Sequence, residues 1–469
     1  MMVTVRRDTE SVQPIALIYT ALSSSIVASL GMLLVPTIAR ELDVAVSTAQ
    51  WTLTINLLVG AVVTPVMGRL SDGPHKKRLL IASLLIIMAG SALAASAPNF
   101  AVFLAGRAMQ GLTYGIVPVT IAIARRYLPP DRLAGGISSL SVTVATGLGL
   151  GYPLTGLLAS DFGFRTAFWF AVVFIASAVA VAWWTIPDGP DDQAPRRPFD
   201  VRGAALFGAG LAALLIGISQ GPDWGWASVP STLTIGGAVV VLAIWVVVSL
   251  RTPHAMVNLR VIRRPDVLLA NGAAIGLGIA MYMGLSIISL VAQAPESTGF
   301  GLAVPVLWAG FVMLPLSVGS FASNRVVRAL SRRVSLTMFL PIGASALTVA
   351  AFAMWLAHNH LWELMAGQFL FGVGIGTTYA AMPGLIARSV VTEELGSAVS
   401  FNQVLRTLGG ALGSALSGAV LTAHAVSPGG PPTETGIRLA LAISAIGCAA
   451  VCVALTANLI SGGARESAR

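Results

Sequence analysis

The chain has 469 residues, of which 56% are hydrophobic and only 10% are charged, and its mean hydropathy is +0.84. A soluble globular protein of this length does not need so much apolar surface, so the composition excludes that class. The formal net charge of +9 would suggest nucleic acid in a soluble protein, but basic loops beside anionic lipid explain it here, and no nucleic-acid partner is expected.

Long apolar runs recur along the whole chain, and we interpret them as membrane-spanning helices, each needing roughly 20 residues to cross a bilayer core of about 30 Å. The first run, about 25 residues from Pro14, is too long for the core of a signal peptide and lacks a clear cleavage site, so we interpret it as a retained span. By this rule the sequence predicts fourteen spans, with connections too short for a soluble domain. They cover residues 13–39, 51–70, 79–97, 100–126, 134–159, 165–186, 201–219, 230–250, 266–292, 303–324, 335–357, 361–387, 397–424 and 437–461.

The basic residues predict how these spans are oriented. Of the 28 lysines and arginines, 23 fall in every second connection, and only Arg40, Arg165 and Arg438 fall in the others. Because short loops rich in Lys and Arg stay in the cytoplasm, both termini are predicted to be cytoplasmic, in a multi-pass protein of the cell membrane, inner or plasma. Arg107 and Arg406 remain, and both lie inside apolar segments.

Two polar, proline-rich connections, residues 187–200 and 251–265, bracket the seventh and eighth spans. The sequence therefore predicts an all-α polytopic membrane protein with a six-helix bundle over 1–190, an inserted pair of spans with flanking loops over 191–265, and a second six-helix bundle over 266–469. Transporters are often built from two such bundles, with the substrate site between them near mid-membrane.

A motif follows the second span, where residues 68–78 read GRLSDGPHKKR. It resembles the loop motif between spans two and three of the major facilitator superfamily, G-x-L-[AS]-D-R-x-G-R-[RK]. The matching residues are Gly68, Leu70, Ser71, Asp72, Lys76 and Lys77, whereas Gly73 and His75 depart from the motif. The resemblance implies a gate in which Asp72 holds the N-terminus of a neighbouring helix or an arginine; the alternative is a solvated loop carboxylate.

A second match, G-R-x-x-Q-G, places Gly106, Arg107, Gln110 and Gly111 in the fourth span. A buried guanidinium costs several kcal/mol unless it is paired or hydrated, so Arg107 is a functional candidate. In proton-coupled exporters of this family the equivalent arginine is thought to assist proton transfer, which the resemblance implies for Arg107. The alternative is an arginine held by carbonyls and Gln110 as interhelical glue.

The third match is GLGLGYPLTG, residues 147–156, in the fifth span. It is similar to the family's antiporter motif G-x-x-x-G-P-x-x-G-G, although Tyr152 stands in the usual place of the proline, Pro153 follows it, and Thr155 replaces a glycine. A run of glycine and proline permits a kink and close helix contact, so Gly151, Pro153 and Gly156 are further gate candidates. The alternative is a simple packing kink.

The whole chain resembles the fourteen-span drug and proton antiporter branch of this family. The resemblance implies an exporter of small organic compounds, with protons as the expected coupling ion. It also points to Arg406 in the thirteenth span, which either has a functional role or snorkels to the cytoplasmic face as an anchor. The acid that members of the branch commonly carry in the first span is absent, because Val27 stands at its place.

None of the 19 Asp and Glu residues lies deep in a predicted span. A proton carrier must then be a carboxylate near a helix end or a histidine near the outer face. The candidates are Asp43, Asp72, Glu363, His358, His360 and His424. Polar and aromatic residues in the spans predict the substrate cavity, which suits an amphiphilic organic molecule. These cavity candidates are Ser25, Ser29, Asn56, Tyr114, Tyr152, Tyr282, Trp308, Gln368, Tyr379, Phe401 and Gln403, although any one of them is also explained by packing.

Two other classes of function compete with an exporter. One is a carrier of the same fold that moves a specific metabolite without proton coupling. The other is a membrane enzyme or sensor, which should show clustered catalytic residues at membrane depth or a soluble output domain, and neither is present. No cofactor and no metal site are expected, since Cys448 and Cys452 lack partners on the last apolar helix. We expect a monomer in the bilayer that binds a small-molecule substrate and carries out no catalysis.

Overall fold

The computed structural model describes residues 13–31, 34–44, 46–49, 51–188, 198–331, 333–391, 394–426 and 432–467. Helices form almost all of the regular structure in these ranges, with one isolated bridge between Ala425 and Pro432. Thirteen helical segments are long and apolar enough to cross a membrane, and the apolar helix Pro14–Ser29 is shorter. The prediction of an all-α polytopic membrane protein with about fourteen spans is confirmed.

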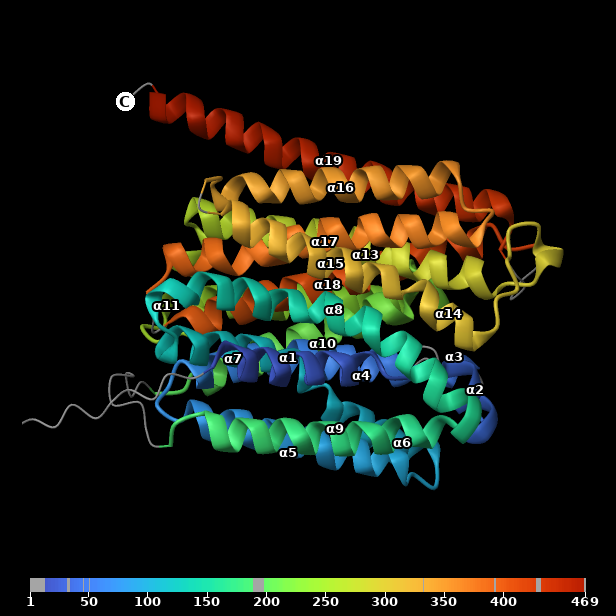
Figure 1. The fold of residues 1–469 in the computed structure, drawn as a ribbon, viewed down its shortest axis with the longest axis horizontal. Coiled ribbons are helices and arrows are strands. Elements are labelled where there is room, and N and C mark those ends of the chain that lie inside the picture. Colours follow the sequence, from blue (N-terminus) through green and yellow to red (C-terminus); the bar gives the residue numbers. More distant parts are fainter. Residues whose placement is uncertain are drawn as a thin grey trace, which may run out of the picture.

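The helices run side by side along one direction, with the N-terminal and C-terminal helices on opposite sides of the molecule (Figure 1). The first group comprises α1 (Pro14–Ser29), α2 (Val35–Glu41), α3 (Val46–Ala49), α4 (Trp51–Ser71), α5 (Lys76–Ala95), α6 (Phe100–Gln110), α7 (Thr113–Tyr127), α8 (Pro130–Phe162) and α9 (Phe164–Thr185). Helices α10 (Val201–Trp224), α11 (Val229–Arg251) and α12 (Leu259–Ile262) follow. The last group comprises α13 (Pro265–Gln293), the 3-10 turn η1 (Glu296–Thr298), α14 (Val306–Val312), α15 (Leu314–Leu330), α16 (Leu336–Leu356), α17 (Leu361–Ser389), α18 (Leu395–Ala423) and α19 (Glu434–Ser467).

Polar residues at the helix starts satisfy the free N–H groups that every helix leaves there. Asn99 accepts a hydrogen bond from Val102 N, and Asp200 accepts one from Gly203 N. Glu363 reaches back to the backbone of His360 in a capping box at the start of α17. These caps fix where the helices begin.

Three predicted spans are interrupted. The first is divided into α1 and α2 because Gly31 has φ +96°, a left-handed conformation that ends the helix. The fourth breaks between α6 and α7 after Gln110, and the tenth breaks between α14 and α15 at Met313. Window hydropathy averages over such breaks, so the sequence shows only continuous apolar runs there.

The two groups meet along two seams. Helix α4 packs on α18, and α8 packs on α14, α15 and α17. Helix α10 covers the first seam, since it packs on both α4 and α18, and α11 packs on α10. The Phe207 ring of α10 packs on Trp245 of α11 in a tilted arrangement, with 4.5 Å between the ring centroids, and both lie beside Phe401 of α18. The outward face of α11 is apolar and exposed, with Val239 and Val247 among its residues.

Candidate gate and substrate site

Asp72 lies at the end of the bundle that carries Arg69, Lys76, Lys77, Arg125 and Arg328, which we call the basic end. Its carboxylate bonds to the start of α18, a helix of the other group. Oδ1 accepts a hydrogen bond from Gly396 N at 2.7 Å, and Oδ2 accepts one from Ser397 N at 3.0 Å. A carboxylate at free N–H groups of a helix start is stabilised by both hydrogen bonds and the helix dipole. Asp72 thus joins α4 to α18.

Two glycines allow α4 and α18 to approach at this point. A Cβ atom at Gly396 would lie 2.6 Å from Asp72 Oδ1 and 2.7 Å from Gly68 O. A Cβ atom at Gly68 would lie 2.7 Å from Gly396 O and would also overlap Ser400. Gly68 was predicted as a gate residue, whereas Gly396, its partner in space, was not.

Burial raises the pKa of Asp72 to about 7, although the hydrogen bonds from Ser397 and Gly396 and the nearby Arg69 oppose this shift. The ordinary value is 3.8, which applies to an exposed carboxylate. A carboxyl whose pKa is raised in the closed contact binds a proton more tightly there. The stabilisation that protonation of Asp72 gives to this contact is therefore fully present below about pH 4 and is lost as pH rises through about 7.

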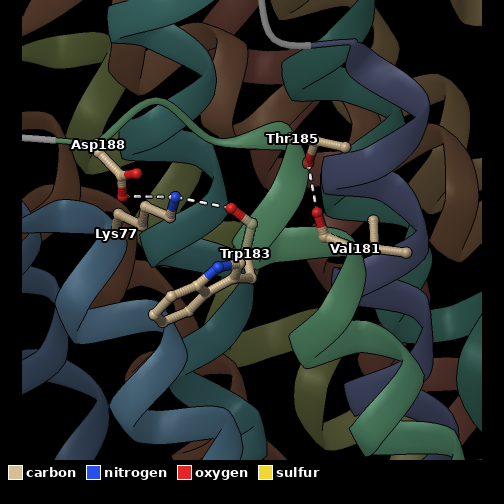
Figure 2. A network of polar contacts seen from close by, with 5 residues as sticks. All are labelled: Lys77, Val181, Trp183, Thr185 and Asp188. Carbon is tan, nitrogen blue, oxygen red and sulfur yellow. Dashed lines mark hydrogen bonds and ion pairs between the residues drawn. The ribbon is translucent and has the colours of Figure 1, made fainter.

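The two lysines of the same motif stay within the first group of helices. Figure 2 shows Lys77 of α5 reaching the last turn of α9, where Nζ donates to Trp183 O and to Asp188 Oδ1, both at 2.7 Å. The ammonium also lies 5.5 Å from the centroid of the Trp183 ring. Lys76 Nζ donates to Gly73 O at 2.9 Å within the turn. Lys77 thus occupies the favourable position for a cation at a helix C-terminus.

Further polar contacts across the groups lie at the basic end. Arg125 of α7 donates to Ala387 O at 2.8 Å and to Val390 O at 3.3 Å, both at the end of α17. Asn324 of α15 donates to Ser138 Oγ of α8 at 2.9 Å. Sequence reasoning did not single out these residues, because an arginine or an asparagine at a helix end is common in loops that face water.

Arg107 is fully buried inside the first group of helices. It donates from Nη1 to Gln110 Oε1 at 2.5 Å and from Nε to Thr52 O at 3.4 Å, and its Cζ lies 5.8 Å from the Phe168 ring centroid. A Cβ atom at Gly31 would lie 3.6 Å from Arg107 Cζ, so the C-terminal end of α1 faces the guanidinium. The negative end of a helix dipole stabilises a cation at this place.

The glycine run of α8 packs on helices of both groups. A Cβ atom at Gly151 would overlap Ser29 of α1, and one at Gly147 would overlap Ser25. On the other face, a Cβ atom at Gly310 of α14 would lie 2.8 Å from Tyr152 O and 3.1 Å from Pro153 Cα. Gly156 is buried. The helix continues through Pro153, so this run supplies close approach of α8 to α1 and α14.

A small cavity lies between the two groups at mid-bundle, lined by residues of α1, α7, α8 and α18. Its lining residues are Ser25, Ala28, Thr113, Tyr114, Val117, Val144 and Gln403. Its volume is about 20 Å³, which holds roughly one water molecule and no organic substrate. The groups must therefore move apart before a substrate can bind there.

The other predicted cavity residues take several positions. Tyr282 and Tyr379 lie near Arg406, and Tyr282 also lies near Tyr114 and Tyr152. Asn56 donates to Arg107 O at 3.1 Å, and Ser29 Oγ donates to Ile26 O at 2.7 Å, so both make contacts within the first group. Gln368 donates to the sulfur of Met313 at the α14–α15 break.

Trp308 and Phe401 lie away from the cavity. The Trp308 side chain is 58% exposed and packs on Phe311. Phe401 packs against the inserted pair. The aromatic and polar residues of the spans therefore include residues that line the cavity, but residue type alone did not show which of them point into it.

Arg406 of α18 is 3% exposed and does not snorkel to the surface. Its Cζ lies 4.3 Å from the centroid of the Tyr379 ring, a close cation–π contact. The described carboxylates lie outside the helices or in their first or last turns, far along the chain from this position. Within the described ranges there is also no group of three or more His, Cys, Asp or Glu that could hold a metal ion.

The predicted proton carriers other than Asp72 have structural roles or exposed positions. Glu363 caps α17 together with His360. His358 and His424 each place Nδ1 3.0 Å from a carbonyl of their own helix, and Asp43 is exposed with φ +51°. Asp72 is the candidate whose carboxylate bonds across the two groups.

The family model described as Major Facilitator Superfamily matches residues 16–414 of the chain. The chain belongs to this superfamily. The three sequence motifs lie in the first group, whereas the match also covers the pair that follows and the second group as far as α18. Members of the superfamily are transporters, and the interpretation as a transporter and not an enzyme is confirmed.

Known relatives of this major facilitator agree with that assignment. The chain is 25% identical over 384 residues to the multidrug resistance protein B homolog of Mycobacterium tuberculosis, covering 79% of this chain and 69% of that one. It is 26% identical over 397 residues to the probable actinorhodin transporter of Streptomyces coelicolor, with 82% and 67% covered. Its fold is similar to the crystal structure of the human organic anion transporter MFSD10, with a TM-score of 0.63, 16% identity, and 94% and 98% covered.

Proposed function

We propose that this major facilitator exports small amphiphilic organic compounds across the cell membrane by alternating access of two six-helix bundles, in exchange for protons. The bundles in this proposal are residues 1–190 and 266–469, with the inserted pair 191–265 at their edge. Both termini and the basic end face the cytoplasm in this orientation, because lysines and arginines are concentrated there.

The single observation that carries the proposal is the contact of Asp72 with the start of α18. It joins the two helix groups at one end, through two hydrogen bonds that separate completely when the helices part. The central cavity is too small for an organic molecule while this contact is made. This arrangement supports a closed cytoplasmic gate and a central site that opens outward.

Two further observations support drug export with proton exchange. The pKa of Asp72, about 7 in the closed contact, places its titration within the physiological range. Opening the gate to water would lower this pKa and release the proton, so a proton and the gate are coupled. The multidrug resistance protein B homolog and the actinorhodin transporter are named for drug resistance and for transport of an organic compound.

The test is uptake into proteoliposomes with an imposed pH gradient, using a panel of amphiphilic organic compounds. Export in exchange for protons requires accumulation that depends on the gradient and collapses with a protonophore. A carrier of one metabolite without proton coupling would transport one member of the panel at a rate that does not depend on the gradient. Gradient-independent transport would therefore replace the exchange mechanism with that alternative.

A further inference from the structure

Arg406 occupies the middle of the membrane. It lies eleven residues after Leu395, the first residue of α18, which at 1.5 Å per residue places it about 17 Å from the basic end. The hydrophobic core of a bilayer is about 30 Å thick, so this depth is close to its midplane. The side chain is nevertheless buried within the protein, over the ring of Tyr379.

The guanidinium of Arg406 has hydrogen-bond donors without partners among the described residues. Nε and Nη1 are both buried, and neither has a hydrogen-bond partner among the described residues. No described carboxylate lies on the interior turns of any helix, so no ion pair offsets the charge. A buried, unpaired guanidinium is costly, and such a group persists where it binds a ligand.

The aromatic side chains beside Arg406 come from the second bundle, and one of them, Tyr282, also lies near tyrosines of the first. Tyr282 of α13 lies within electrostatic reach of Arg406, Tyr379, Tyr114 and Tyr152. These four tyrosines are four of the six in the whole chain. The Tyr282 ring also packs on Gly410, one turn beyond Arg406 on the same face of α18. Arg406 thus lies beside Tyr379 of α17 and Tyr282 of α13, and Tyr282 in turn lies near tyrosines of α7 and α8.

The central cavity lies against the turn of α18 that precedes Arg406. Gln403, one turn before Arg406 on the same face of α18, lines the cavity together with Tyr114 of α7. The Tyr114 hydroxyl and Gln403 Oε1 are buried without hydrogen-bond partners. Unsatisfied polar atoms on both bundles therefore converge on the space that must widen when the bundles separate.

Arg107 does not provide an equivalent site. Gln110, Thr52 O and Phe168 contact its guanidinium, and the end of α1 lies against it. Nη2 of Arg107 is also buried without a hydrogen-bond partner, but Nη1 and Nε are bonded, so Arg107 is held by its own bundle and has one open nitrogen where Arg406 has two.

From these observations we propose that Arg406 is the anion-binding residue of the substrate site, and that the preferred substrates are amphiphilic monoanions. The carboxylate or phenolate of the substrate bonds to the free guanidinium donors, and its aromatic or apolar body packs among Tyr114, Tyr282 and Tyr379. One guanidinium offsets one negative charge, so a dianion leaves a charge unpaired. This inference rests on the proposed function and adds the charge of the substrate.

Binding of three probes with one apolar skeleton tests the proposal: 2-naphthoate, 2-naphthamide and 2-naphthylmethylammonium. Equilibrium dialysis against the purified full-length protein at pH 7.5 gives the three Kd values. The wild type is expected to bind naphthoate at least about tenfold more tightly than the amide, a difference of about 1.4 kcal/mol. The ammonium probe is expected to bind most weakly.

Two variants separate the charge from its position. Arg406→Gln removes the cation and is expected to bring naphthoate and naphthamide within about twofold of each other, with the Kd for the amide unchanged. The matched control is Arg438→Gln, because Arg438 pairs with Glu434 at 2.8 Å on an exposed turn of α19. This control is expected to keep the full preference. Arg406→Lys retains the charge and is expected to keep part of it.

Several outcomes would overturn the proposal. The first is a wild type that does not bind naphthoate more tightly than the amide. The second is an Arg406→Gln variant that still prefers naphthoate. The third is an Arg406→Gln variant that loses affinity equally for all three probes. The wild-type comparison decides the matter even if Arg406→Gln does not fold. Counterflow in proteoliposomes distinguishes a failure of the anion site from a failure of the proposed exporter. Transport of the amide and the ammonium probe without transport of naphthoate refutes the anion site and leaves the exporter standing. Binding that is selective for the anion, with no transport of any probe, refutes the exporter alone.

Discussion

Replacing Gly396 by alanine should open the cytoplasmic gate. The added Cβ atom would lie 2.6 Å from Asp72 Oδ1 and 2.7 Å from Gly68 O, distances at which α4 and α18 must move apart. Overpacking of this kind costs about 1–3 kcal/mol. Because alanine favours helices over glycine, the loss falls on the contact between helices and not on α18 itself. We expect the closed state to lose about 5-fold to 150-fold in its equilibrium with the open state.

The assay measures access to the central cavity. Val144→Cys places a thiol in the cavity wall, in a background where Cys448 and Cys452 are replaced by alanine. A membrane-impermeant maleimide applied to inside-out vesicles should modify this thiol at least about fivefold faster in Gly396→Ala than in the parent. The same reagent applied to right-side-out vesicles should react more slowly.

Gly418→Ala is the matched control, since Gly418 lies on the same helix and nothing lies within 4 Å of its Cβ position. Labelling in this control should equal that of the parent. A rate for Gly396→Ala within twofold of the parent from the inside, at equal protein amounts, would show that the contact does not control access. An equal increase in Gly418→Ala would assign the effect to the helix.

Three other predictions follow from individual contacts. Asp72→Asn retains one acceptor oxygen and cannot titrate, so its counterflow rate should fall below about half of the wild-type rate and lose its pH dependence. In the wild type, the equilibrium constant for gate opening should rise by up to about tenfold per pH unit between pH 4 and pH 7, and no further above pH 7. A variant with a wild-type pH profile would rule out Asp72 as the titrating group. Gly31→Ala should lower the free energy of unfolding by about 1–2 kcal/mol, because φ at this residue is +96°. The measurement is the melting temperature, and the control is Gly236→Ala, where nothing lies near the Cβ position. Equal melting temperatures of the two variants would show that alanine is not strained at position 31. Cysteines at Val239 and Val247 should react with a lipid-soluble maleimide and poorly with a water-soluble one from either side, and protection of either by substrate would place α11 at the cavity.

The spans and their order could be predicted from the sequence because an apolar run of about 20 residues is stable in a bilayer as a membrane-spanning helix, in which the backbone hydrogen bonds are satisfied within the segment. The breaks could not, since they depend on one left-handed glycine at Gly31 and on the turn at Met313 inside apolar runs. The broken helices still keep apolar residues on both sides of the break, so hydropathy is the same for one helix or two.

The candidate site divides in a similar way. The resemblance of the motif implied that Asp72 holds either the N-terminus of a neighbouring helix or an arginine, and in the structure it bonds to the start of α18. The motif did not identify Gly396, which lies 324 residues away and matters only because two backbones touch. Lys77 matched the same motif, yet its ammonium caps α9, because the nearest free carbonyl and carboxylate belong to Trp183 and Asp188. The motif identified which residues are polar at this position in the chain, but their partners depend on how distant helices pack and could not be predicted from the motif.

The interrupted first span has a consequence for how charge is balanced in this membrane protein. Arg107 faces the carbonyl end of α1, and those carbonyls cannot take up a proton at any pH that a cell meets. A carboxylate in the first span would release the arginine when acidified, but backbone dipoles keep their strength. The electrostatic partner of this buried cation therefore does not change with acid, and in the proposed exchange mechanism a proton would act at the carboxyl between the two groups, Asp72.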